Sequence, residues 1–170
     1  PASYLLSFLG RRGMSATRQR LLRPLCRAID ALAPLAAKPF RFPEPPVKAG
    51  SLGGRTLSAS LVQFTKGRSL RPRYNEPVVS WMLEGLAAKE GRGDFHQRVV
   101  RDERHAILGW YLFYVKRGGM ATVVQIGAGE KGADTVLDHL FHFAWVQGAV
   151  AVSGQADPGL FHALARKQCF

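Results

Sequence analysis

The sequence predicts an α+β (mixed α/β) protein, in which a central, mostly antiparallel sheet is flanked by helices and preceded by a helical arm. Three observations favour this class. Apolar residues recur at helical spacing in the first half, strand-like segments separated by tight turns follow from residue 95 to 126, and a strand–glycine turn–helix–strand unit spans residues 119–155. A chain of 170 residues, 46% of them hydrophobic, can bury one sizeable core, or one core with an arm.

The N-terminal part is predicted to be an arm and a linker. Residues 4–9 form a short helix, and Ser15 caps a second one in which Leu22, Leu25, Ile29 and Leu32 are the apolar positions and Pro24 introduces a kink. The proline-rich stretch from Pro39, together with Lys48 to Gly54, is typical of a linker. We therefore expect a basic helical arm with its linker over residues 1–50 and a folded domain over residues 51–170.

The folded domain is predicted to begin with two helices and to continue with strands. Asn75 is a suitable cap for the second helix, and Arg92-Gly93-Asp94 a suitable turn. The predicted elements are helices at 56–64 and 76–86, strands at 95–101, 105–116 and 120–126, a helix at 134–147, a strand at 149–153 and a last helix from 157. The strand at 105–116 is apolar on both faces, which indicates a central position covered on both sides. Trp81, Trp110 and Trp145 are expected in the core.

Charge is distributed unevenly. Residues 1–75 contain fourteen Lys or Arg and two acidic residues, whereas residues 76–170 contain ten of each kind. Such asymmetry is typical of an arm that binds nucleic acid or a membrane, and equally of a surface that faces an acidic partner or a missing domain. The first residues carry no initiator Met or signal-peptide pattern, and the last resemble the middle of a domain, so we expect a fragment of a longer protein.

Two cysteines, Cys26 and Cys169, are too few for a disulfide framework and are expected to be buried thiols in a reducing, cytoplasmic protein. The longest apolar runs fall short of the roughly 18 residues that indicate a membrane span.

The glycine-rich turn is the strongest functional signal. Gly127-x-Gly129-x-x-Gly132 follows a strand and precedes a helix, where unpaired backbone N–H groups and the helix dipole favour phosphate. A dinucleotide site would also need further βαβ units and an acidic residue at the end of the next strand, which instead ends Val152-Ser153-Gly154-Gln155. A nicotinamide or flavin site and a purely structural glycine turn remain as alternatives.

The order of these elements resembles the GNAT superfamily of acetyltransferases, from about Leu57 to Phe170. In that family an antiparallel hairpin leads into a central strand, a glycine-bearing loop holds the pyrophosphate of acyl-CoA at a helix N-terminus, and a short strand and a helix follow. Here these parts are the hairpin at 105–126, the loop at 127–132, the helix at 134–147, the strand at 149–153 and the final segment 164–170. The last predicted helix is also the end of the sequence, so the family's final hairpin is absent from it.

The resemblance implies that acetyl-CoA or another acyl-CoA binds around the loop, and that the acyl group passes to an unidentified amine. The implied coenzyme-binding residues are Gln125, Ile126, Gly127, Ala128, Gly129, Lys131, Gly132 and Ala133. Ala128 stands where the family usually has glycine, Ala165 where it often has the tyrosine that protonates the thiolate, and the strand offers no glutamate as base. No catalytic residue is therefore assigned, and the domain is either an N-acetyltransferase that works by positioning or a degenerate lobe of a tandem protein.

Other candidate sites have weaker support. His139 and His142, with Asp138, are spaced i, i+3 on one helix face, but a metal site needs a third ligand that the sequence does not identify, so a solvated or interface face is expected. The sequence contains no Gly-x-Ser-x-Gly, helix-turn-helix or zinc-knuckle pattern. The alternative to acyl transfer is a non-catalytic module whose basic N-terminal half binds nucleic acid, a membrane or a protein partner, with self-association as a further option.

Overall fold

The computed structural model describes residues 17, 21–22, 24–26, 28–29, 43–64, 74–129, 131–155, 158–167 and 169. Two compact units are present, Pro1–Phe42 and Pro43–Phe170. The second unit contains the elements β1 (Lys48–Ser51), α3 (Gly54–Phe64), α4 (Glu76–Ala87), β2 (Asp94–Arg101), β3 (Ile107–Val115), β4 (Met120–Ala128), α5 (Ala133–Val146), β5 (Ala151–Ser153), a 3-10 turn η2 (Pro158–Leu160) and α6 (Phe161–Arg166).

The five strands form one sheet in the order β1-β2-β3-β4-β5, with every pair antiparallel except β4 and β5. A tight turn at Arg117–Gly119 joins β3 to β4, and Gly118 adopts the positive φ (72°) that this turn requires. The parallel pairing of β4 with β5 follows from the crossover through α5. The predicted α+β class with a mostly antiparallel sheet is confirmed.

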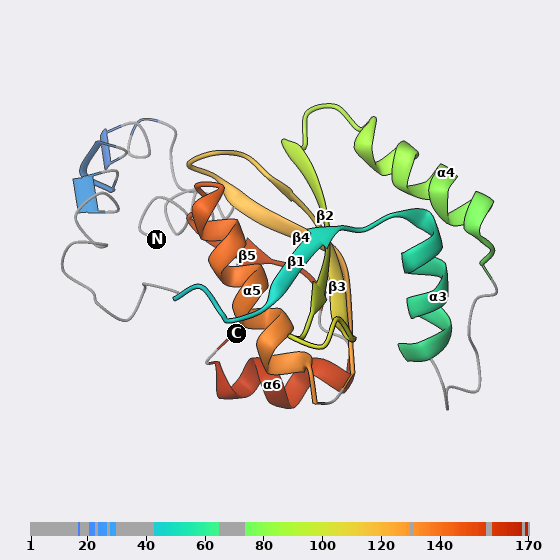
Figure 1. Ribbon diagram of the computed structural model, residues 1–170. Helices are drawn as coiled ribbons and strands as arrows, with labels where there is room; N and C mark the ends of the chain where they lie inside the picture. The colour runs from blue at the N-terminus through green and yellow to red at the C-terminus, as the bar shows by residue number, and fades with distance from the viewer. Residues whose placement is uncertain are drawn as a thin grey trace. The chain divides into compact units, whose positions relative to one another are not determined.

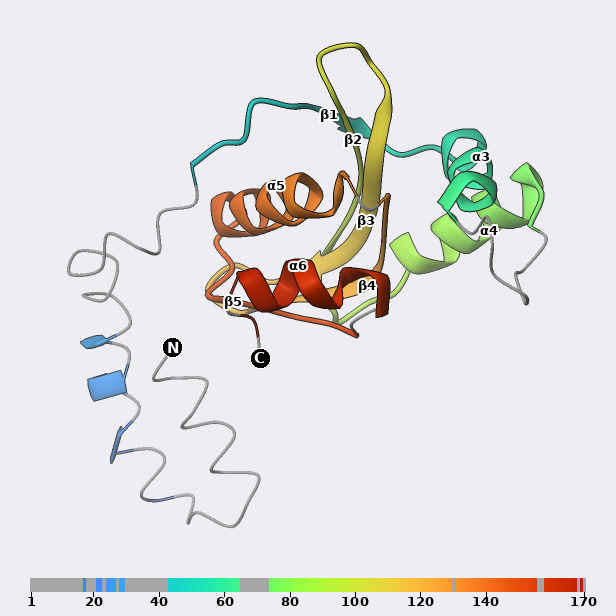
Figure 2. The same cartoon turned by 90° about the horizontal axis from the view of Figure 1, so that it is seen from below.

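Helices cover both faces of the sheet (Figures 1 and 2). On one face, Tyr111 and Phe113 of β3 pack with Val136 and Leu140 of α5 and with Ala163 of α6. On the other face, side chains of α3 and α4 pack against the remaining side chains of β3, in a cluster that includes Leu57, Val79, Leu83, Trp110 and Leu112. β3 is therefore central and buried on both sides, as its apolar sequence predicted.

The ends of α3 and α4 lie within two residues of their predicted positions. The Asn75 side-chain oxygen accepts a hydrogen bond from the Val78 amide at 3.1 Å, which confirms the predicted cap of α4. The predicted helix at 56–64 is confirmed as α3, which begins two residues earlier at Gly54. In the first unit, the described residues between Thr17 and Ile29, Pro24 among them, are helical. The predicted helix at 4–9 lies outside the described residues.

Several sequence-based expectations were wrong. Lys48–Ser51, assigned to the linker, is the edge strand β1 and pairs with Arg98–Arg101 of β2. Trp110 is in the core as expected, but Trp81 and Trp145 are 72% and 46% exposed. Cys169 is exposed and Cys26 half-buried, so neither is the buried thiol that was predicted. Among the described helices, none is long and apolar enough to cross a bilayer.

Candidate functional site

The glycine-rich segment is divided between a strand and a turn. β4 runs two residues further than predicted, so Gln125, Ile126, Gly127 and Ala128 lie in the strand and pair with Leu112, Tyr111, Trp110 and Gly109 of β3. Gly129, Lys131 and Gly132 form the turn, and Ala133 is the first residue of α5. The residues that the resemblance implies for coenzyme binding thus extend from the end of β4 to the beginning of α5.

Packing explains two of the glycines in this segment. A Cβ atom at Gly127 would lie 2.7 Å from the Trp110 ring, and one at Gly132 would lie 2.7 Å from the Leu108 carbonyl oxygen. A Cβ at Gly129 would meet only the Phe64 ring, at the ordinary contact distance of 3.5 Å. None of the three adopts a positive φ. Gly127 and Gly132 are therefore required because other atoms pack closely against their backbone. This agrees with the alternative that the glycine turn is purely structural, and it does not exclude a ligand.

The backbone amides of this segment are not all available to an anion. The Gly129 amide donates to Leu108 O at 3.3 Å, and the Gly132 amide donates to Gly129 O at 2.9 Å. The expectation that the whole turn presents unpaired N–H groups is therefore wrong for these two residues. Helix geometry leaves the first-turn amides of Ala133, Asp134 and Thr135 without an intrahelical acceptor, because the regular bonds begin at Val136. These three are the donors that α5 offers.

A β-bulge at Val124 interrupts β4. The register passes from Leu112↔Gln125 to Phe113↔Val123, so Val124 has no partner residue on β3. Ala121 and Val123 face the α5 side of the sheet before the bulge, and Ile126 and Ala128 face it afterwards. Because the bulge shifts the alternation of side chains between the two faces by one residue, Val124 and Gln125 both lie on the face of the sheet that α3 and α4 cover. The bulge was not predicted from the sequence.

β4 and β5 separate immediately beside the bulge. Their pairing extends only over Met120↔Ala151, Ala121↔Val152 and Thr122↔Ser153, whereas β4 continues to Ala128. Within the described part of the chain, no strand pairs with β4 on this side beyond Thr122. The backbone polar groups of this part of β4 that point away from β3 therefore have no strand partner among the described residues.

Charged side chains surround the beginning of α5. Lys131 is exposed in the turn, as expected for either a phosphate contact or a solvated lysine. Asp134 pairs with Arg166 at 2.5 Å, while Lys167 Nζ lies 2.6 Å from Asp138 Oδ1 and 4.0 Å from Asp134 Oδ1. Arg166 and Lys167 stand at the end of α6, far away in the sequence, so only the fold reveals that they meet this helix.

A mostly apolar cavity of about 440 Å³ lies on the α3–α4 side of the sheet. Val124 and Gln125 line it from β4, Leu112 from β3 and Leu57 and Leu61 from α3. α4 and the residues at its two ends contribute the rest of the lining, namely Tyr74, Val79, Trp81, Met82, Leu83, Gly85, Leu86 and Lys89. The bulge therefore opens directly into this cavity.

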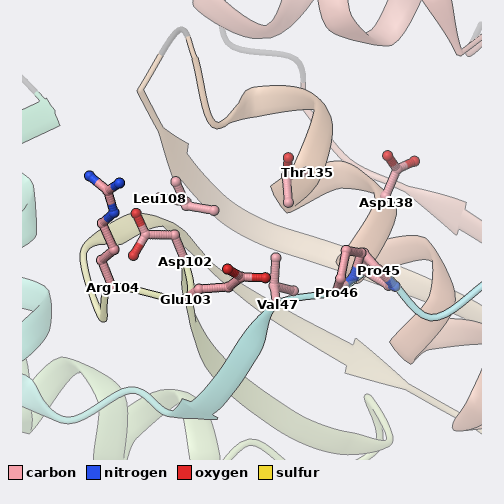
Figure 3. Close-up of a pocket in the computed structure, with 9 residues that line it drawn as sticks. All are labelled: Pro45, Pro46, Val47, Asp102, Glu103, Arg104, Leu108, Thr135 and Asp138. Atoms are coloured by element: carbon pink, nitrogen blue, oxygen red, sulfur yellow. The ribbon is translucent and has the colours of Figure 1, made fainter.

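A second cavity of about 430 Å³ lies on the other face of the sheet, toward β1 (Figure 3). Thr135 and Asp138 line it from α5, and Asp102 and Glu103 line it from the β2–β3 turn. Among the described residues that line it, Asp138 is paired with Lys167, and the two remaining carboxylates outnumber the one cation, Arg104, so the cavity disfavours phosphate.

The expectation of a solvated or interface face on α5 is wrong for His139, which is buried, whereas His142 is half-buried. His139 is only 8% exposed, and its Nδ1 lies 2.7 Å from the Tyr111 hydroxyl, to which it is hydrogen-bonded. Burial, followed by the charges of His142 and Arg98, lowers the pKa of His139 to about 4, against a smaller opposing effect of Glu44. Within the described residues, no cluster of three His, Cys, Asp or Glu side chains is placed to bind a metal.

No family model matches the chain, and no curated protein sequence matches it. Similar solved structures do exist. An acetyltransferase from Trypanosoma brucei has 9% identity over 71% of this chain and 90% of its own, with a TM-score of 0.49. Glucosamine-6-phosphate N-acetyltransferase from Arabidopsis thaliana has 14% identity over 72% of this chain and 89% of its own, with a TM-score of 0.47. A transcriptional regulator from Bacillus halodurans has the same identity, the same coverage of both chains and the same TM-score. Solved acetyltransferases are thus among the chains of similar structure, and at these identities the likeness concerns the arrangement of the chain.

Proposed function

We propose that residues 43–170 form a GNAT-type domain that binds an acyl-CoA and transfers its acyl group to an amine. The observation that carries this proposal is the early end of the β4–β5 pairing, after Thr122 and Ser153, beside a β4 that continues to Ala128 and leads into α5. An extended arm with amide groups, such as the pantetheine of CoA, can hydrogen-bond to such an unpaired strand edge. The phosphate end of the coenzyme then reaches the first turn of α5.

The pyrophosphate site consists of the three first-turn amides of α5 and the exposed Lys131. The amides of Ala133, Asp134 and Thr135 and the positive end of the helix dipole favour an anion. Asp134 would repel phosphate, but its carboxylate is paired with Arg166 and lies near Lys167. Arg166 therefore offsets the negative charge of Asp134, while Lys167 bonds mainly to Asp138.

The transfer step relies on position and on backbone donors. An oxyanion forms when an amine attacks the thioester, and an N–H group aimed at it lowers the barrier. Val124 is the residue that the bulge leaves outside the register with β3, and its amide is the donor that we assign to this role. Orientation of the thioester and the amine within the site contributes further, without a side-chain acid or base.

Acetyl-CoA is expected to raise the melting temperature of the protein by several degrees. At a concentration about a hundred times the dissociation constant, linkage adds about 2.7 kcal/mol to the free energy of unfolding. The charge reversal Lys131→Glu is expected to weaken affinity about fivefold to tenfold, because it places a negative charge beside the phosphates. The measurement is a thermal-shift titration with acetyl-CoA.

Lys116→Glu is the matched control for this experiment. Lys116 is also an exposed lysine, but it lies at the β3–β4 turn, at the opposite end of β4 from Lys131. Its reversal leaves acetyl-CoA affinity unchanged if the coenzyme binds where we place it. The absence of any shift with the wild-type protein at millimolar acetyl-CoA would rule out the proposal, and equal effects of the two reversals would rule out the location.

A second candidate function is suggested by charge alone. The net charge of +12 is carried entirely by residues 1–75, which favours binding of nucleic acid or another polyanion by the N-terminal half. In that case DNA affinity is expected to fall at least a hundredfold between 50 and 200 mM salt, because several phosphate contacts release counterions. Fluorescence anisotropy with a labelled duplex measures this, and an affinity that does not change with salt would exclude the second function.

A further inference from the structure

The apolar cavity beside the bulge indicates which kind of amine the site accepts. Its walls are hydrophobic and aromatic, with Trp81 and Tyr74 contributed by α4 and the residues that precede it. A volume of about 440 Å³ is within the range of small-molecule sites. Because Val124 also lines it, a molecule in the cavity lies next to the amide that we assign to the oxyanion.

The charge of the lining limits the protonation state of the acceptor. Lys89 is charged, and none of the described residues that line the cavity is an aspartate or glutamate. The segment 65–73, which connects α3 to α4, also contains no acidic residue. An alkylamine is protonated at neutral pH, with a pKa near 10.4, and an ammonium group would find no counter-charge here. Among the described lining residues it would also find no carboxylate to take its proton before attack.

An aromatic amine avoids both difficulties. Its lone pair is delocalised into the ring, so the amine is neutral at pH 7 and can attack without a base. Its ring matches the Trp81 and Tyr74 lining. Lys89 then provides a counter-charge for a carboxylate elsewhere on the same molecule.

We propose that the acceptor is a weakly basic aromatic amine that carries a carboxylate, bound between α4 and the β4 bulge with its ring beside Trp81 and its carboxylate at Lys89. This inference rests on the proposed acyl transfer. In the reaction the amine nitrogen bonds to the acyl carbon, the carbon–sulfur bond breaks, and the sulfur leaves with the electron pair as a thiolate. The nitrogen loses one proton, and a proton from solvent neutralises the thiolate, so the products are an amide and free CoA.

The first test is binding, with para-aminobenzoate as the probe and equilibrium dialysis as the measurement. Trp81→Ala is expected to weaken binding about tenfold, whereas Trp145→Ala, which removes an exposed tryptophan from α5, leaves it unchanged. Lys89→Gln is expected to weaken binding of para-aminobenzoate at least threefold and to have no effect on its uncharged ethyl ester. Equal effects of Trp81→Ala and Trp145→Ala, or of Lys89→Gln on the acid and its ester, would overturn the assignment.

The second test is turnover, measured as release of free CoA from acetyl-CoA with para-aminobenzoate, spermidine or a lysine peptide as acceptor. The aromatic amine is expected to react at least tenfold faster than either alkylamine. Faster reaction of spermidine or the peptide would overturn the inference. The acetyl-CoA thermal shift, recorded on the same samples, separates failure of this inference from failure of the proposed function. A thermal shift without binding of the aromatic amine contradicts only the inference about the acceptor. The absence of a thermal shift contradicts the proposed function.

Discussion

Replacement of Gly109 by alanine is expected to destabilise the domain by about 3 kcal/mol. Gly109 lies on β3 opposite Ala128, at the end of β4 where the glycine turn begins. An added Cβ would collide with the Gly127 carbonyl oxygen and would lie 2.8 Å from Val136 Cγ2 and 3.0 Å from Ala128 Cα. Two of these neighbours are backbone atoms, so the strands themselves must separate. The expected loss in the free energy of unfolding is therefore at the upper end of the range for overpacked cores. Urea unfolding measures the change.

Gly50→Ala is the matched control. Gly50 is also a strand glycine, but a Cβ built there has no neighbour within 4 Å, so the expected change in the free energy of unfolding is below about 0.5 kcal/mol. Because Gly109→Ala moves the beginning of α5 relative to β4, it should also weaken acetyl-CoA binding in the protein that remains folded. A stability equal to that of Gly50→Ala would show that β3 and β4 do not approach as closely as described.

The elements that could be predicted are those that depend on local chemistry. Asn75 capped α4 as expected, because its side chain bonds to an amide three residues away. The β3–β4 turn was recognised from consecutive glycines, one of which needs a positive φ. β3 was recognised as central because apolar residues on both of its faces have to be covered on both sides.

The features that were missed depend on which segments meet in space. The bulge at Val124 arises from the register between β3 and β4, and nothing in the local sequence marks it. β1 resembles a linker because Lys48, Ala49 and Gly50 have low strand propensity, and only its pairing with β2 makes it a strand. The cations at Arg166 and Lys167 reach α5 through the packing of α6, about thirty residues later in the chain.

Loss of stability in mild acid is the other large effect that we expect. In the folded protein the pKa of His139 is lowered to about 4, mainly by burial, whereas an exposed histidine has a pKa near 6.5. Between these values the unfolded chain binds a proton that the folded protein does not, so stability falls as the pH falls from 6.5 toward 4. At pH 4.5 this contribution amounts to about 2–3 kcal/mol.

The variant His139→Gln isolates this contribution. Glutamine does not titrate, so the variant should be less stable than the wild type at pH 7, where the hydrogen bond with Tyr111 is altered, and should lose about 2–3 kcal/mol less on acidification. Groups common to both proteins cancel in this comparison, among them His96, whose pKa is also lowered by burial. The matched control is His162→Gln, which removes a histidine from an exposed position on α6. Identical slopes for His139→Gln and His162→Gln in urea unfolding from pH 7 to 4.5 would show that His139 is not held neutral against Tyr111.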